Sequence, residues 1–428
     1  MSYTAAVLGK TVDKPVDRRE GQSPSLRDAR SSKATVSIVR VHDYDCTKVY
    51  EAVKKGVELI GGLDGLIKPG SQVFVKINHL SPPSPPERGI VTHPVFTEAV
   101  LRLLKAFSAN ITVGDDIASH GTDGFLISGF RQMCHRADVR LVNLREGGFV
   151  EVDCNGYFLD KVYLSKIALD ADVIINLPKL KTHSLTVLTG GVKNMYGTIP
   201  SGLRTRFHGE YAKKEDFGQV LTDIFCAIRP QLTIMDGIVA MEGEGPASGG
   251  LRRLGVVLAS QDAVAVDAVV AKTVGLNPMD IYTTRYCDER GLGVGNLDNI
   301  RVVGEKMKSI AVPDFRAPVS ATNLVIQRAP GFLPKFVTRH LCVRPQVIES
   351  QCTGCGECEK TCPAGAISVA GKTARINPSL CIECMCCHEA CRFNAIVPTR
   401  SIVGIAVHSL AIIVNKLRSL SAWHSSRC

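Results

Sequence analysis

The stretch 352-CTGCGECEKTCP-363 is followed by a second copy of its cysteine pattern, 381-CIECMCCHEACR-392. Both copies space their cysteines as C-x2-C-x2-C-x3-C, which is the run by which bacterial ferredoxins bind cubane [4Fe–4S] clusters. The first three cysteines of a run surround one cube on a tight loop, and the fourth ligates the other cube. Two tandem copies therefore predict two [4Fe–4S] clusters.

The spacing also predicts which cysteines share a cluster. We expect the fourth cysteine of each run to open a helix that points away from its own loop, so that the two runs exchange their last ligands. A disulfide framework would suit a short secreted chain, and zinc sites usually use two C-x2-C pairs, so neither explains eight cysteines at these offsets. The expected ligands are Cys352, Cys355, Cys358 and Cys391 for cluster 1, and Cys381, Cys384, Cys387 and Cys362 for cluster 2.

The second run departs from the first at two positions. Cys386 offers a rival thiolate beside Cys387, although the x2 register favours Cys387 as the ligand. Arg392 stands where the first run has Pro363. Its cation either raises the potential of a nearby anionic cluster or points into solvent, and the sequence leaves both interpretations open.

The rest of the chain predicts a larger domain. Short apolar strands alternate with helical stretches of 3.6-residue periodicity, which is typical of a three-layer α/β domain with a mostly parallel sheet. A small α+β ferredoxin-type dicluster domain follows it. The expected parts are a flexible extension (1–33), the α/β domain (34–305), a proline-containing linker (306–345), the ferredoxin domain (346–400) and an amphipathic tail helix (401–428).

Composition narrows the class of function. The net charge of +10 is spread along the 428 residues, and no nucleic-acid-binding motif is present, so we expect no nucleic acid partner. Cysteines outside the two runs are scattered singly, which fits a reducing cytoplasm. The apolar tail 402–414 has a basic end, and it could dock on the protein, seal a dimer or touch a membrane surface, with docking favoured.

Polar residues after the proposed strands predict a ligand site, because ligands of parallel α/β sheets bind beyond the carboxyl ends of the strands. The stretch 179–208 is rich in cations and glycines, which favours an anionic small molecule over the alternative of a solvated basic loop. The candidate ligand-binding residues are Lys76, Asn78, Lys179, Lys181, Lys193, Asn194, Arg204 and Arg206. The candidate catalytic residues are His183, His208 and Asp236.

Acidic residues near the later strands have two interpretations. Asp236, Glu242, Glu244, Asp262 and Asp267 could hold a metal ion or supply a base. Asp262 and Asp267 also flank the start of a helix, so capping explains them equally well.

The large domain resembles the domain of unknown function 362 family. The resemblance rests on several short motifs, although the first reads Lys-Ile-Asn where Lys-Pro-Asn is expected. It implies an α/β domain followed by a two-cluster ferredoxin domain, and a redox-active iron–sulfur protein, without implying a substrate. The motifs are Val75–Asn78, Thr92–Pro94, Gly114–Asp115, Leu177–His183, Lys193–Asn194 with Gly197, and Met235–Gly237 with Glu242–Pro246.

These observations favour an iron–sulfur oxidoreductase that passes electrons from an external low-potential donor or partner redox enzyme to an anionic ligand on the α/β domain. Two other functions remain open from the sequence. The chain could be an electron-transfer subunit whose α/β domain docks a partner enzyme. It could also bind an anion without redox chemistry, with clusters that are structural or that sense redox state.

Overall fold

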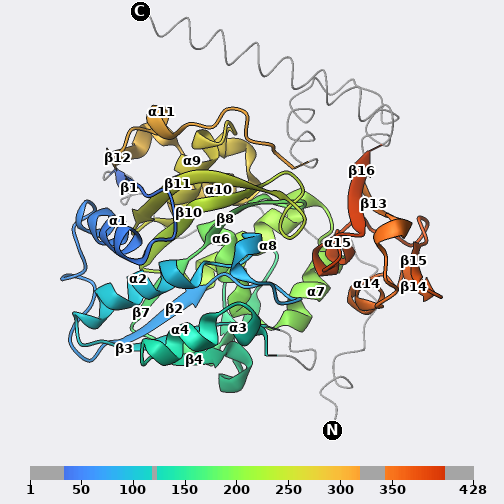
Figure 1. The fold of residues 1–428 in the computed structure, drawn as a ribbon, viewed down its shortest axis with the longest axis horizontal. Helices are drawn as coiled ribbons and strands as arrows, with labels where there is room; N and C mark the ends of the chain where they lie inside the picture. Colours follow the sequence, from blue (N-terminus) through green and yellow to red (C-terminus); the bar gives the residue numbers. More distant parts are fainter. Residues whose placement is uncertain (1–32, 118–122, 319–342, 401–428) are drawn as a thin grey trace, which may run out of the picture.

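The computed structural model describes residues 33–117, 123–318 and 343–400. The large domain is built on a ten-stranded sheet in the order β12-β1-β11-β10-β7-β2-β3-β4, and β8 pairs with β10 and with β9 (Figure 1). The strands are β1 (Ala34–Arg40), β2 (Gln72–Ile77), β3 (Asn110–Asp115), β4 (Arg140–Asn143), β7 (Val173–Leu177), β8 (Lys179–His183), β9 (Val187–Thr189), β10 (Leu232–Glu242), β11 (Gly250–Ser260) and β12 (Ile300–Gly304).

Most neighbouring strands of this sheet run parallel. The pairs β1–β12, β10–β7, β7–β2, β2–β3, β3–β4 and β10–β8 are parallel, whereas β11 is antiparallel to both of its neighbours and β9 is antiparallel to β8. The predicted, mostly parallel α/β fold is therefore confirmed, and the sheet is mixed.

Helices cover both faces of the sheet because its strands are apolar on both sides. Val73, Val75 and Ile77 of β2 pack into one core, whereas Phe74 between them packs into another. The first core includes α1 (Cys46–Glu58), α2 (Pro94–Lys105), α3 (Gly124–Ile127) and α4 (Phe130–Arg136). The cores on the other face include α6 (Gly191–Asn194), α8 (Lys214–Ala227), α9 (Ala263–Thr273) and α10 (Tyr282–Glu289).

The stretch 179–208 differs from the basic loop that was one interpretation of the sequence. It forms β8, β9, α6, a short 3-10 turn and α7 (Ser201–Glu210), and every residue from Lys179 to Val192 is buried. A run of basic residues usually indicates a solvated loop. Here Lys179, Lys181 and Arg204 are instead paired with carboxylates and a carbonyl from other parts of the chain. Smaller elements of the domain are β5 (Phe149–Asp153), β6 (Lys161–Ser165), α5 (Lys166–Leu169) and α11 (Met307–Ile310).

The C-terminal domain consists of small antiparallel strand pairs and two short helices. β13 (Val343–Val347) pairs with β16 (Ile396–Arg400), and β14 (Ile367–Ala370) pairs with β15 (Thr373–Ile376) through a turn at Gly371. The helices are α14 (Glu357–Thr361) and α15 (Cys386–Ala390). Cys362 and Cys391 cap the ends of these helices, so the expectation that the fourth cysteines open helices was wrong.

Figure 1 shows this domain beside α7, at one edge of the large domain. The expected extension (1–33) and tail (401–428), and much of the expected linker (306–345), lie outside the described residues, and the boundaries drawn from the sequence stay predictions. Within the described ranges, no helix is both long and apolar enough to cross a membrane.

Candidate functional site

The eight cysteines of the two runs line two separate small cavities. One cavity is lined by Cys352, Cys355 and Cys358 together with Cys391 from the second run. The other is lined by Cys381, Cys384, Cys386 and Cys387 together with Cys362 from the first run. The side chains are therefore gathered in two crossed sets, each with at least the four thiols that a [4Fe–4S] cluster requires. Cys386 is a fifth thiol in the second set, so the choice of Cys387 as the ligand stays a prediction.

Backbone amides point at three of these sulfurs, as expected around cluster ligands. The N–H groups of Ala366, Ala374 and Ala395 donate to the sulfurs of Cys362, Cys352 and Cys391 at 3.2, 3.4 and 3.2 Å. Such hydrogen bonds stabilise thiolate charge and tune the potential of a cluster.

The two cluster loops share a backbone shape but not a sequence. Gly354, Gly356 and Gly365 of the first repeat have positive φ angles of 68°, 77° and 58°. The equivalent residues of the second repeat, Glu383, Met385 and Asn394, have φ angles of 60°, 63° and 54°. Because side chains disfavour this left-handed region, the second loop holds a conformation that its sequence alone does not favour.

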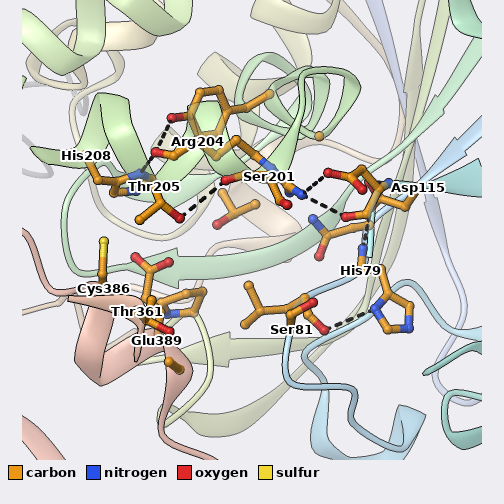
Figure 2. A pocket seen from close by; sticks show the side chains of 18 of the residues that line it. His79, Ser81, Asp115, Ser201, Arg204, Thr205, His208, Thr361, Cys386 and Glu389 are labelled. Carbon is orange, nitrogen blue, oxygen red and sulfur yellow. Dashed lines mark hydrogen bonds and ion pairs between the residues drawn. The ribbon is translucent and has the colours of Figure 1, made fainter. Parts of the chain in front are cut away.

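A larger cavity lies between the two domains. Its volume is about 340 Å³, and it is lined by residues in and just after β2, β3, β8 and β9, by α6 and α7, and by the cluster-domain helices α14 and α15. Figure 2 shows His208, Thr205, Ser201 and Arg204 on one side, with Cys386 and Glu389 reaching toward them from α15.

Cys386 borders two cavities at once. It lines the cavity that holds the cluster 2 cysteines, and it also lines the interdomain cavity. Cys386 is thus the residue through which the second cysteine set adjoins the interdomain cavity. Arg392 is exposed, which favours the solvent interpretation of that side chain.

Most of the charge around the interdomain cavity is paired. Lys76 lies 2.9 Å from Asp115, and Arg204 lies 2.7 Å from Asp116, all of these carboxylates being buried. Arg145 also binds Asp116, at 2.5 Å. Burial lowers the pKa of Lys76, although Asp115 opposes the effect.

Two further lysines face the cavity without a paired carboxylate of this kind. Lys181 donates to the carbonyl oxygen of Ile90 at 2.7 Å, and the Lys193 ammonium lies 5.7 Å from the centre of the Tyr196 ring. Burial, reinforced by Lys193, lowers the pKa of Lys181 to about 7. Burial also lowers the pKa of Lys193 to about 8, against the attraction of Glu389. An anion entering the cavity would relieve both lysines.

Two histidines line the same cavity. His183 lies 3.3 Å from Glu389 of α15, measured from Nε2 to Oε1, and its Nδ1 accepts the backbone N–H of Leu185 at 3.1 Å. His208 places Nδ1 2.7 Å from the carbonyl oxygen of Arg204. Burial lowers the pKa of both rings, that of His208 to about 3.

A chain of three amides fixes the orientation of Asn78. Asn176 donates to the carbonyl oxygen of Gly191 at 3.0 Å, so its own oxygen is free to accept from Asn194 at 2.7 Å. The oxygen of Asn194 then accepts from Asn78 at 2.9 Å. The Oδ1 atom of Asn78 is left as a buried acceptor without a partner among the described residues.

Three of the residues proposed from the sequence do not line the cavity. Lys179 and Asp236 form a buried ion pair of 2.8 Å, and the Tyr44 hydroxyl lies 2.6 Å from Lys179 and 2.8 Å from Asp236. The Tyr44 ring stacks on His93 at 3.6 Å. Arg206 points outward from α7 and pairs with Glu210. The other candidates, Lys76, Asn78, Lys181, His183, Lys193, Asn194, Arg204 and His208, are brought together there.

Asp262, Asp267 and Glu242 are held by structural contacts. Asp262 caps α9, and Asp267 accepts the N–H groups of Gly191 and Val192 at 2.6 and 3.1 Å. Glu242 pairs with Arg316. Over the described residues, no group of three or more His, Cys, Asp or Glu side chains is arranged to hold a single metal ion.

The charged and thiol side chains that line the cavity without having been proposed for it include Asp115, Asp116, Cys386 and Glu389. The position of Asp115 and Asp116 directly after a strand was a usable signal. Cys386 and Glu389 reach the cavity only because the two domains dock.

Comparisons with known proteins follow the same division of the chain. Residues 73–272 match the model of the domain of unknown function (DUF362), and residues 345–368 match that of the 4Fe-4S binding domain. A thylakoid-associated protein, sll1697 of Synechocystis sp., is 34% identical over 260 residues, which cover 60% of this chain and 80% of that protein.

Ferredoxins resemble the C-terminal part alone. A ferredoxin-like protein from the nif region of Rhizobium leguminosarum bv. trifolii is 43% identical over 53 residues, covering 12% of this chain and 83% of that protein. A ferredoxin of Alicyclobacillus acidocaldarius is 43% identical over 54 residues, covering 12% and 69%. The C-terminal part is therefore an iron–sulfur, ferredoxin-like electron-transfer domain, and the chain belongs to the DUF362 family.

Proposed function

We propose that this protein is an oxidoreductase that passes electrons through two [4Fe–4S] clusters to a small anionic ligand in the interdomain cavity. Cys352, Cys355, Cys358 and Cys391 would hold one cluster, and Cys381, Cys384, Cys387 and Cys362 the other. When bound, the clusters supply single electrons.

The observation that carries this proposal is the shared wall at Cys386. A cavity lined by the thiols of cluster 2 and a cavity lined by Lys181 and Lys193 meet at one residue. A ligand on these lysines would therefore lie next to the second cluster. An electron-transfer domain that only served a distant partner would not need to close a polar cavity with its own helix.

The residues of this chain have distinct parts in the proposed chemistry. Lys181 and Lys193 bind and orient the anion, and Lys76 and Arg204 are fixed beside it by their ion pairs with Asp115 and Asp116. The helices α14 and α15 close the cavity on one side and reduce its contact with water, which strengthens these attractions. Electrons would arrive from an external low-potential donor or partner redox enzyme.

We also propose that the protein is located in the cytoplasm. A cytoplasmic location suits free thiols, since the described cysteines form no disulfide. The name of the Synechocystis relative keeps contact with a membrane surface open as the less favoured alternative.

The proposal is tested on protein purified without oxygen. Iron content should approach eight atoms per chain, as two cubane clusters require. Mass spectrometry of the denatured protein should identify a recurrent small anion. Treating the intact protein with dithionite should convert that anion into a reduced product, and Cys381→Ala protein that remains folded should fail to do so.

A matched pair of variants makes the ligand test specific. The double variant Lys181→Met with Lys193→Met should lose the anion, whereas Arg206→Gln, on the outward face of α7, should keep it. Protein with both clusters loaded but no anion would contradict the proposal and favour an electron-transfer subunit. A bound anion that dithionite leaves unchanged would favour the non-redox alternative.

A further inference from the structure

The two cavity histidines are held in opposite tautomers by the backbone. His208 Nδ1 lies 2.7 Å from the carbonyl oxygen of Arg204, which can only accept, so Nδ1 carries the hydrogen. His183 Nδ1 accepts the N–H of Leu185 at 3.1 Å, so its hydrogen must be on Nε2. Nε2 of His183 is thus a donor that lies 3.3 Å from Glu389, whereas Nε2 of His208 is an acceptor that faces the cavity.

The acceptor on His208 has no partner among the described residues. Its Nε2 atom is buried, and the same holds for Oδ1 of Asn78. Buried polar atoms of this kind cost free energy unless something bonds to them, and both residues line the cavity. The low pKa of His208, about 3, keeps its ring neutral and Nε2 able to accept at physiological pH.

The ligand must therefore satisfy two different demands. Lys181 and Lys193 attract an anionic group, and Nε2 of His208 can accept a hydrogen bond from a donor. An ammonium donor would be repelled by Lys181 and Lys193, which leaves a neutral donor such as a hydroxyl. The volume of about 340 Å³ is at the small end of ligand pockets and limits the size of the molecule.

We propose that the cavity binds a small carboxylate that also carries a hydroxyl group, with the carboxylate on Lys181 and Lys193 and the hydroxyl donating to Nε2 of His208. This inference rests on the ligand site of the proposed function but not on electron transfer. The two histidines then have different roles, because Nε2 of His183 is a donor beside Glu389, whereas Nε2 of His208 is free to accept a hydrogen bond.

The test compares two acids that differ only in the hydroxyl group. Isothermal titration of the oxidised, cluster-loaded full chain with butanoate and with 3-hydroxybutanoate needs no electron donor. The hydroxy acid should bind roughly tenfold more tightly, the usual worth of one hydrogen bond to a buried partner. Equal affinities, a preference for butanoate, or no binding of either acid at millimolar concentration would overturn the inference.

His208→Phe identifies the acceptor. Its ring would still pack beside Phe217 and Tyr196, and the carbonyl of Arg204 would keep the Tyr196 hydroxyl at 3.0 Å, so the fold should survive. The hydroxyl preference should fall to about one in this variant and persist in Arg206→Gln. A preference that survives in His208→Phe would also overturn the inference. Dithionite conversion of a native ligand without any hydroxyl preference would leave the proposed function intact.

Discussion

Lys179 and Lys181 lie two residues apart on β8, and both are fully buried, yet their surroundings differ. Lys179 belongs to a closed cluster in which it pairs with the buried Asp236 carboxylate and bonds Tyr44. Lys181 belongs to an open cluster in which its own partner is one carbonyl and the nearby polar atoms of Asn78 and His208 have none. A buried charge with complete partners supports the fold, whereas one with incomplete partners indicates a ligand.

The largest expected effect comes from breaking the closed cluster. Lys179→Met leaves the Asp236 carboxylate buried without its cation, which should lower the free energy of unfolding by about 3–5 kcal/mol. Lys181→Met removes a desolvated ammonium with no paired carboxylate, so it should change stability little or raise it. Denaturant titration of both variants measures the contrast. Equal losses would show that the two clusters do not differ in this way.

As pH rises, the open cluster should bind its ligand less tightly, while the free protein should become more stable. With pKa values of about 7 and 8, Lys181 and Lys193 lose protons in the free protein above neutral pH, so an anion must restore them. Affinity for 3-hydroxybutanoate should therefore fall by about tenfold per pH unit for each proton taken up, as pH rises from 7 to 9.

Stability of the free protein should respond with the opposite sign. Between pH 7 and the unfolded value of 10.5, the unfolded lysine binds more protons than the folded one, so wild-type stability rises relative to Lys181→Met. Denaturation of both proteins at pH 6.5 and pH 9 (about half a unit below and two units above the folded value) measures this difference. Affinity that rises with pH would contradict the assignment of these lysines.

The smallest effect is expected for Arg206→Gln on the outward face of α7, which is compared with Arg204→Gln on the inward face. Arg206 is half exposed and pairs with the exposed Glu210, so Arg206→Gln should change the free energy of unfolding by less than about 0.5 kcal/mol and leave ligand affinity unchanged. Arg204→Gln removes a guanidinium that binds the buried Asp116 and lines the cavity, so it should lower both the free energy of unfolding and the affinity for the ligand. Calorimetry of the two variants decides whether the inward and outward faces of α7 differ.

Periodicity and cysteine spacing are the features of the sequence that predict most of the fold. They are local properties, so the alternation of strands and helices and the crossed cysteine sets could be predicted. The face of α7 was also legible, because Arg204 and His208 are four residues apart and share a helix face that Arg206 does not. Grouping the cations only by their nearness in sequence overlooked that signal.

The partners of the buried lysines could not be predicted in the same way. Asp236 lies far from Lys179 along the chain and meets it only because β10 pairs with β8. Glu389 comes from the other domain and reaches His183 through docking. Pairing across strands and domains depends on the packing of the whole fold, so neither local pattern nor composition contains it.

The contacts between the two domains fix the orientation of the small domain. It is nearly two-fold repetitive, so its two ends could in principle exchange places against the large domain. Asn394, which accepts from Arg88 and Ser248, stands where the first repeat has Gly365, and His388, whose Nε2 lies 3.2 Å from the carbonyl oxygen of Glu244, stands where it has Glu359. Only the second repeat can make these bonds. In the proposed function, the second cluster would therefore lie at the ligand cavity, and the first would be the one that takes electrons from the external donor.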